Sequence, residues 1–545
     1  KQIHIDKETR LMEKYALAFF IGIVAVTTIS SFLSLFMRIS ALALGINAFL
    51  ALLLWGILIR KKRLPVIHFS RKRITVVQAL SLVVLAAAVI LTLVSVTFTP
   101  ANSDTGIYHA QAIHWIEAYP AVPGLALLHS RFGFNSSWLV LNALFSFSFL
   151  DIQSFHTLPS LLFLISLLYF FIGLFEVAGG SRKASDIARA AFFVGCLLFL
   201  TPEISSPGTD LPATLITWFI TAELIRWVEL KSPDGSTHLF WLSLIAIFTV
   251  TIKLSAAPLA LIAVYWAICR LKERQWNRLL ALIAVSLVLL MPFMGRNIII
   301  SGHLIYPGFN FDPIHLEWSI PRQEVQREKE TIHAFALLPR VTNENFRQMT
   351  WQQQYRRWFF DQLPRHQAML LFLGIALPVW LLLLVLKSWR RWLRENSQIF
   401  LPVVTLVTGS LYWLISAPAM RFGYGFLVGL IVALGVPLIL FVLNAVRPMD
   451  KIFSPLVLLI TILISGNTLY HTLSPALKPS QIVLPLDYPS LPTEPCAFGN
   501  FLIDCATQYQ SCWYEPFPCA VQPDLKVRSR STQRRASTGN RAHAH

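Results

Sequence analysis

The chain has 545 residues, of which 55% are hydrophobic and only 14% are charged. Its apolar residues form uninterrupted runs, which a water-soluble globular protein of this size cannot bury, so the composition excludes a soluble enzyme. The net charge of +18 does not indicate nucleic-acid binding, because most of the basic residues follow the pattern of cytoplasmic loops between membrane spans.

Apolar runs of membrane-spanning length predict an all-α polytopic membrane protein with about thirteen transmembrane helices. The runs are Tyr15–Phe36, Ile39–Ile59, Ile74–Phe98, Thr157–Ala178, Ile187–Thr201, Leu211–Val228, Leu239–Ile252, Ala256–Cys269, Leu279–Ile300, Ala368–Leu386, Ile399–Ser416, Phe422–Leu443 and Ile452–Tyr470.

Clusters of Lys and Arg in alternate short loops predict the orientation. The strongest is in the loop 60–73, with others near Arg182, Arg270, Arg390 and Arg447. All of them fall on one side if the N-terminus is cytoplasmic, which makes the C-terminus extracytoplasmic. This topology requires that Trp138–Leu150 does not cross the membrane but lies along its outer surface as an interfacial helix.

The order of these runs divides the chain into six parts. They are 1–73, two N-terminal spans and a basic loop; 74–300, a transmembrane core with a first outer loop at 99–156; 301–365, a second long outer segment; 366–470, the last spans; 471–527, an outer tail with cysteines; and 528–545, a disordered basic end.

Four cysteines, Cys496, Cys505, Cys512 and Cys519, lie close together in the Pro-rich outer tail. This number in an extracytoplasmic segment indicates two disulfides, for which the pairs Cys496–Cys505 and Cys512–Cys519 are the nearest choice. Zinc binding is the alternative, although the spacings are long and no His lies among the cysteines.

Asp104 follows the third span by a few residues, at the start of a helix that we expect to end near Tyr119. A carboxylate at the outer surface can meet a lipid-borne substrate and still remain ionised, so Asp104 is a candidate general base. Tyr108 and His109 on the same helix are candidate substrate contacts. The alternative is that Asp104 only caps the helix.

A second acid, Asp210, stands in the loop Thr201–Pro212 directly before a span, together with Glu203. It is also a candidate catalytic residue, with helix capping as the alternative.

Lys253, Arg296 and Arg421 are expected at the same outer level, where basic residues are disfavoured. Cations and acids at one depth fit a site that holds a phosphate beside a base, because the guanidinium can form bidentate hydrogen bonds with phosphate oxygens. Snorkelling to the interface is the alternative for the arginines.

The segment Arg296–Pro307 adds His303 and Tyr306 to the candidates. Ser301-Gly302 ends the helix and Tyr306-Pro307 begins a loop, so both side chains could donate hydrogen bonds to a phosphate or a sugar. The alternative is that both are interfacial anchors.

From Ile74 to Tyr470 the chain resembles the GT-C superfamily of membrane glycosyltransferases, and more narrowly a group of bacterial multi-spanning proteins within it. The resemblance is carried by the acid Asp104 early in a long outer loop, by Asp210 before a span, by Arg296–Pro307 and by Arg421–Tyr424. Cys512–Cys519 is similar to the same bacterial group.

The resemblance implies a bacterial plasma-membrane enzyme of the cell envelope that takes a sugar from a polyprenyl phosphate and transfers it, with inversion, to an extracytoplasmic glycan, lipid or protein. Asp104 would be the base, while Arg421, Arg296 and Lys253 would stabilise the leaving phosphate. Some relatives hold a divalent metal at their first-loop acids. Since Asn102–Thr105 contains a single acid, we expect no metal or other cofactor to be required.

Two other classes remain open. A transporter of lipids or glycans would also carry charged residues in broken helices, but near the bilayer midplane and with an internal repeat. A non-catalytic structural subunit of an envelope complex would use the long outer loops for binding other proteins.

Overall fold

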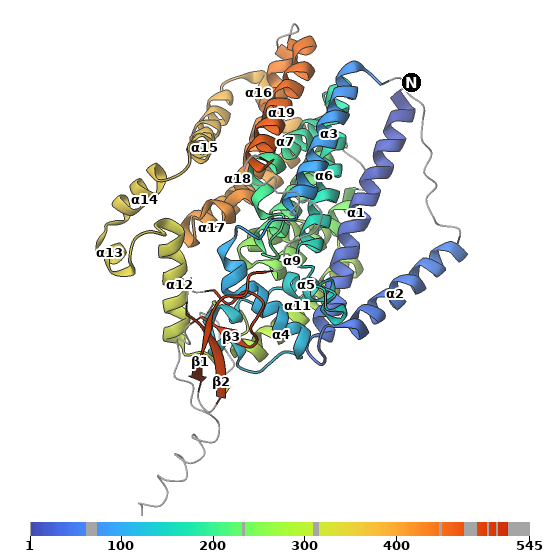
Figure 1. The fold of residues 1–545 in the computed structure, drawn as a ribbon. Helices are drawn as coiled ribbons and strands as arrows, with labels where there is room; N and C mark the ends of the chain where they lie inside the picture. The colour runs from blue at the N-terminus through green and yellow to red at the C-terminus, as the bar shows by residue number, and fades with distance from the viewer. Residues whose placement is uncertain are drawn as a thin grey trace, which may run out of the picture.

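The computed structural model describes residues 2–61, 74–230, 235–308, 316–445, 449–473, 488–498, 501–507 and 511–521. Most of them are helical, and the long helices lie side by side in one bundle, with the three strands at one end of it (Figure 1). The predicted disordered end 528–545 and most of the basic loop 60–73 lie outside the described residues.

The elements follow one another along the chain as α1 Gln2–Leu33, α2 Ala41–Arg60, α3 Val76–Ser95, α4 Ala110–Ala118, α5 Ser137–Leu144, α6 Thr157–Ala178, α7 Ala184–Gly195, α8 Asp210–Leu230, α9 Gly235–Ile252, α10 Leu261–Lys272, α11 Trp276–Ser301, α12 Arg322–Leu337, α13 Asn343–Gln348, α14 Trp351–Phe360, α15 Pro364–Leu383, α16 Lys387–Glu395, α17 Phe400–Ser416, α18 Met420–Ala445, α19 Met449–Leu473, β1 Thr493–Phe498, β2 Phe501–Ala506 and β3 Cys519–Ala520.

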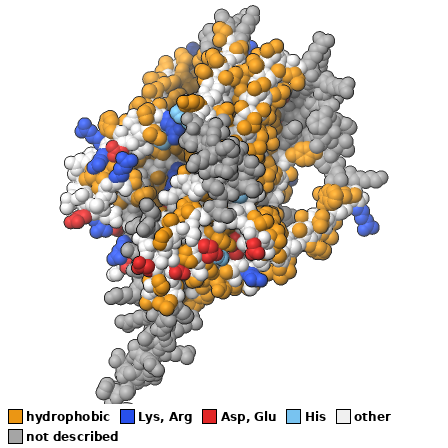
Figure 2. Space-filling view, in the orientation of Figure 1, with side chains coloured by type: hydrophobic (Ala, Val, Ile, Leu, Met, Phe, Trp, Pro, Cys, Tyr) orange, Lys and Arg blue, Asp and Glu red, His pale blue; other side chains and the backbone are white. Residues whose placement is uncertain are grey.

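Twelve helical segments in the described residues are long and apolar enough to cross a membrane, so the chain is an integral membrane protein. They coincide with twelve of the thirteen predicted runs. The remaining run, Leu239–Ile252, lies in α9, whose apolar part Ser236–Ile252 is shorter than the others. Figure 2 shows hydrophobic side chains over much of the bundle surface, as expected for helices that face lipid.

Helix α9 nevertheless runs back along α8. Asp210 begins α8 and Lys253 directly follows α9, and the two side chains form an ion pair. The start of α8 and the end of α9 therefore lie at the same end of the bundle. The loop after α3 and the start of α18 meet them there, so we call this the site end.

The centre of the bundle is α8, in which 89% of the most apolar stretch is buried. Helices α6, α7, α9 and α18 pack around it. A close approach of α6 and α7 depends on Gly173, because a Cβ at that position would lie 2.5 Å from the carbonyl oxygen of Asp186.

Helix α5 differs from the expected interfacial helix at Trp138–Leu150. It has only eight residues, and all of them are buried between α1, α4 and α9. Its apolar residues thus contact protein, and only the end of the expected segment, at Phe149 and Leu150, is exposed. The segment does not cross the bundle, as expected, but its helix is buried instead of lying on the surface.

The tail forms a small sheet in the order β1-β2-β3, with β1 and β2 antiparallel. The disulfides Cys496–Cys505 and Cys512–Cys519 confirm the predicted pairing. The first joins β1 to β2, and the second closes a loop that ends in β3.

A buried ionic network joins α1, α7 and α8 at the end of the bundle opposite the site end. Arg189 donates to Glu13 at 2.8 Å and to Asp186 at 2.6 Å, while Arg226 pairs with Glu13 and with Glu223, the latter at 3.0 Å. The network also contains Tyr169 and His238, both against Glu223. The side chains of Glu13, Asp186, Arg189 and Glu223 are at most 4% exposed, so their charges compensate one another without water.

Replacement of Arg189 by Met should destabilise the fold strongly, because it leaves Asp186 as a buried carboxylate without its Arg partner. Breaking a buried pair costs about 3–5 kcal/mol. Unfolding in mixed detergent micelles measures this loss. Arg357→Met is the control, since the Arg357–Asp361 pair is more than half exposed and should contribute less than about 1 kcal/mol. Equal losses in the two variants would contradict a structural role for the buried network.

Candidate functional site

Asp104 lies at the site end, where the chain leaves α3 and enters a π-helical turn at Thr105–His109 that leads into α4. The side chain of Asp104 makes no capping hydrogen bond. Its Oδ1 accepts from Arg131 at 2.9 Å and its Oδ2 accepts from Arg421. The capping explanation is therefore wrong for Asp104, whose carboxylate is held between two guanidinium groups.

Arg421, in the first turn of α18, contacts three acceptors with its three nitrogens. Besides Asp104 Oδ2, it donates to Asn102 Oδ1 at 2.7 Å, and its Nε lies 3.4 Å from Asp210 Oδ2. The planar fork of the guanidinium suits such a bridge. Arg421 thus joins the two predicted catalytic acids, which are more than 100 residues apart in the chain.

Asp210 and Lys253 complete this side of the cluster. Asp210 Oδ1 accepts from Lys253, whose Nζ also lies 3.7 Å from the ring centroid of Phe422. A small recess of about 10 Å³ lies against Asp210, Lys253, Arg421 and Phe422 and continues between α8 and α18. This volume holds about one water molecule. A larger ligand therefore requires these side chains to move.

Four further residues join the cluster without having been predicted as site residues. Asn102 Nδ2 donates to Glu203 Oε2 at 3.0 Å. On the other side, Arg131 Nε lies 3.7 Å from Glu328 Oε1, and Glu328 is also held by the hydroxyl of Ser130. Arg131 could have been found, because it is the only Lys or Arg between Thr99 and His156. Glu328 lies in the polar helix α12, where no sequence signal distinguishes it from its neighbours.

The cluster contains four carboxylates and three cations. The side chains of Asp104, Arg131 and Arg421 are 15–24% exposed, whereas those of the ionic network at the opposite end are nearly all enclosed. Ionisable groups that pair with one another in or beside apolar helices are a hypothesis for a functional site. Partial exposure makes this cluster the one that a ligand can reach.

His109 and Tyr108 lie beside the cluster. His109 is buried, and its Cε1 lies 3.1 Å from where a Cβ would stand on Gly208, in the loop that carries Asp210. Burial lowers the pKa of His109 to about 4, so the imidazole is neutral at pH 7. Burial, and next the charge of Asp104, raises the pKa of Tyr108, whose ring lies 5.8 Å from the Arg131 guanidinium. Both side chains can therefore take part as neutral hydrogen-bonding groups.

Arg296, His303 and Tyr306 are placed elsewhere. Arg296 donates to Ser34, directly after α1, at 3.2 Å, and the His303 Nε2 lies 2.8 Å from the carbonyl oxygen of Ile320. Tyr306 is buried with its ring 5.6 Å from that of Phe134. These three residues support the loops around the site, and none of the described contacts joins them to Asp104 or Asp210.

The acids of the cluster are held by cationic side chains. Among the described residues, no group of three or more His, Cys, Asp or Glu side chains could hold a metal ion. The guanidinium of Arg421 contacts both Asp104 and Asp210, and Lys253 takes the second oxygen of Asp210. Cationic side chains thus occupy the positions in which these carboxylates would bind a metal.

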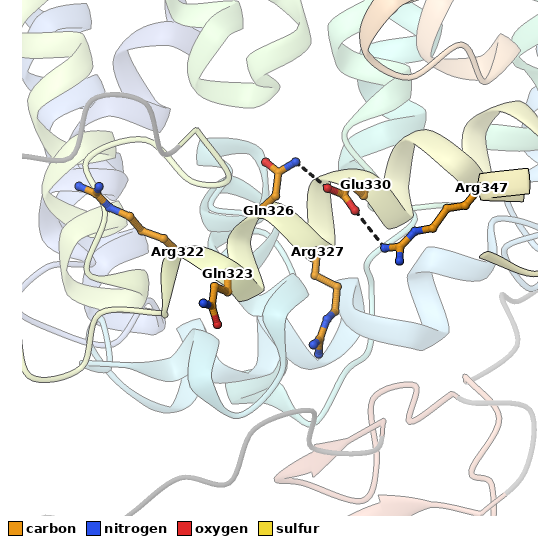
Figure 3. Close-up of a pocket in the computed structure, with 6 residues that line it drawn as sticks. All are labelled: Arg322, Gln323, Gln326, Arg327, Glu330 and Arg347. Carbon is orange, nitrogen blue, oxygen red and sulfur yellow. Dashed lines mark hydrogen bonds and ion pairs between the residues drawn. The ribbon is translucent and has the colours of Figure 1, made fainter. Parts of the chain in front are cut away.

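A wider groove lies on the outward side of α12. It has a volume of about 1130 Å³ and is lined by α12, α13 and the end of α17. A second hollow of about 490 Å³ shares several of its residues, and Figure 3 shows Glu330 between Gln326 and Arg347 in it. Helix α12 therefore carries Glu328 toward the ion-pair cluster and Gln326, Arg327 and Glu330 toward these hollows.

These features define a polytopic helical membrane protein with a partly exposed chain of ion pairs at one end of its bundle. The chain belongs to the family described as Domain of unknown function (DUF8201), which residues 3–428 match. The match includes Asp104, Asp210, Lys253 and Arg421. No curated protein and no solved structure matches the chain.

Glu117 near the end of α4 provides a test of how the tail binds the site end. Its Oε2 accepts a hydrogen bond from the Tyr514 hydroxyl at 2.9 Å. Burial raises the pKa of Glu117 from 4.5 to about 7, although hydrogen bonds from Ser146, Tyr514 and Ser148 oppose this shift. Between these two values the folded protein binds more protons than the unfolded chain, so its stability falls as the pH rises.

We expect this contribution of Glu117 to be fully present below pH 4.5 and lost as the pH rises through 7, a change of roughly 3 kcal/mol. Glu117→Gln should remove it. The measurement is the difference in unfolding free energy between wild type and the variant from pH 4 to pH 8. A difference that grows in favour of wild type with rising pH would contradict the burial of this carboxyl.

Proposed function

We propose that this protein is a glycosyltransferase of the GT-C type, which transfers a sugar from a polyprenyl phosphate to an extracytoplasmic acceptor with inversion. The observation that carries the proposal is the bridge of Arg421 between Asp104 and Asp210 at the site end. An acid beside cations of a kind that can bind phosphate, near the ends of spanning-length helices, supports a site for a lipid-linked phosphate. The N-terminus and the basic loops would then be cytoplasmic, and the site end extracytoplasmic.

In this mechanism the acceptor hydroxyl oxygen attacks the anomeric carbon, and the bond from that carbon to the phosphate oxygen breaks. The bonding electron pair leaves with the polyprenyl phosphate, and the hydroxyl proton passes to Asp104. Arg421 and Lys253 would stabilise the charge that develops on the phosphate. Because Arg296 contacts Ser34 instead, Arg131 is the better third cation.

The ion pairs also suggest how the base becomes available. Every cation of the cluster contacts a carboxylate. A phosphate that binds Arg421 would replace Asp104 Oδ2 as its partner, and that oxygen could then accept the proton. Movement of Arg421 and Phe422 would enlarge the recess between α8 and α18 for the substrate.

The pairing of every cation with a carboxylate also fits a non-catalytic subunit. In such a subunit the cluster would only hold the loops together. A transporter is less well supported, because the cluster lies at helix ends instead of midway along the helices. The assay below distinguishes these classes.

Replacement of Asp104 by Asn should abolish sugar transfer, because the amide keeps the size of the side chain but cannot accept the proton. We expect a loss of about 10²- to 10⁴-fold in membranes supplied with radiolabelled polyprenyl-phosphate sugars. Equal transfer by wild type and by a folded Asp104→Asn variant would exclude Asp104 as the base. Absence of transfer by wild type from every donor would favour the structural subunit.

Arg421→Lys keeps the charge but not the fork that holds three acceptors. We expect the variant to lower kcat about 10²-fold, because the developing charge on the phosphate loses its bidentate partner. The exposed Arg357→Lys is the matched control and should behave as wild type. A variant with unchanged kcat would show that Arg421 does not contact the transferred phosphate.

A further inference from the structure

The loop closed by Cys512–Cys519 binds one face of α4, the helix that follows Asp104. We propose that this loop is a positioning element, which fixes the π-helical turn Thr105–His109 and so holds Asp104 against Arg131 and Arg421. The inference rests on the proposed function only for its catalytic consequence. The contacts themselves stand independently of the reaction.

The first contact is made inside the turn, two residues after Asp104. The carbonyl oxygen of Gly106 accepts from the backbone N–H groups of Cys512 and Trp513, at 2.9 and 2.8 Å. The indole of Trp513 covers the same glycine, since a Cβ on Gly106 would lie 2.8 Å from Trp513 Cε2. Only glycine allows the loop this close to the turn.

The second contact is the side chain of Gln111, which is completely buried. Its Nε2 donates to the carbonyl oxygens of Tyr514 and Pro516, both at 2.9 Å, and its Oε1 accepts from the backbone N–H of Cys519 at 3.1 Å. One amide therefore satisfies three backbone groups of the loop. This requires a side chain that both donates and accepts, which a carboxylate does not.

The third contact continues along the same face of the helix. The ring of His114 stacks between those of Tyr514 and Phe517, at centroid distances of 4.2 and 3.9 Å. Glu117, one turn further, accepts from the Tyr514 hydroxyl. Gly106, Gln111, His114 and Glu117 thus present one continuous surface to the loop. The polar face of this helix is therefore partly covered by protein.

The tail also supports the segment that carries Arg131. Ile503 of β2 and Ala520 of β3 are buried in one cluster with Leu128 and Phe132. The two segments whose side chains form the Asp104–Arg131 pair are therefore packed against the same small sheet and loop. Loss of the loop would loosen both partners of this pair. A displacement of about 1 Å in a reacting group can cost about 100-fold in rate.

The test compares Gln111→Glu with Gln153→Glu. Gln111 donates two hydrogen bonds to the loop, and a carboxylate would lose both. Among the described residues, the only hydrogen bond of the Gln153 side chain is one that it accepts, from the backbone N–H of Tyr488 at 2.7 Å, so a carboxylate keeps that bond. Both are tail contacts and undergo the same chemical change. Gln111→Ala serves as a second variant without the added charge.

The first measurement is amide hydrogen exchange of residues 102–110 in the full-length protein in detergent. We expect exchange to rise in both Gln111 variants and not in Gln153→Glu. The second is sugar transfer, for which we expect kcat to fall about 10- to 100-fold in the Gln111 variants while KM for the donor stays unchanged.

Unchanged exchange in the Gln111 variants would overturn the positioning role, as would unchanged kcat in a variant with raised exchange. If wild type transfers no sugar but exchange rises in the Gln111 variants alone, the loop still fixes the turn, and it is the glycosyltransferase proposal that fails. A fall in kcat that Gln153→Glu shares would also count against a specific role for Gln111.

Discussion

The site end depends on the need to compensate charge where apolar helices meet. Arg421 lies in the first turn of a strongly apolar helix, yet its guanidinium contacts Asp104, Asn102 and Asp210. A cation in such a position is tolerated only with partners, and the partners come from two segments, the loop after α3 and the start of α8. The same contacts that make the charge tolerable therefore determine how α3, α8 and α18 are placed relative to one another.

Helix α8 carries charge at both ends of its buried length. Asp210 belongs to the site end, and Glu223 lies 13 residues further, about 20 Å along the axis, in the opposite network. Both groups of ion pairs join several helices, but they differ in access to water. The opposite network is enclosed, which suits a purely structural role. The site-end cluster remains partly exposed, which leaves its charged groups within reach of a ligand.

Much of the fold could be predicted from the sequence, because membrane spans are read from apolar length alone. Twelve runs became spanning-length helices, and the cysteine spacing gave both disulfides. The association of Asp104, Asp210, Lys253 and Arg421 was also anticipated, since charges at helix ends are conspicuous in an apolar chain.

Helix α5 was placed incorrectly, because hydrophobicity does not distinguish a surface that faces lipid from one that faces protein. Arg296 and His303 could not be excluded from the site for a related reason. Depth along a helix can be read from sequence, but the direction of a side chain around the helix axis cannot, and Arg296 points to Ser34.

The contact between Gln111 and the loop of Cys512–Cys519 joins residues about 400 positions apart. During synthesis, Asp104 emerges long before the segment that fixes the turn beside it, and nine spanning-length helical segments lie between them in the chain. Domains of a growing chain fold from the N-terminus onward. The ion-pair cluster can therefore reach its final geometry only after nearly all of the described helices have been inserted. Biogenesis thus has a built-in order, in which completion of the site reports that insertion of the bundle has finished.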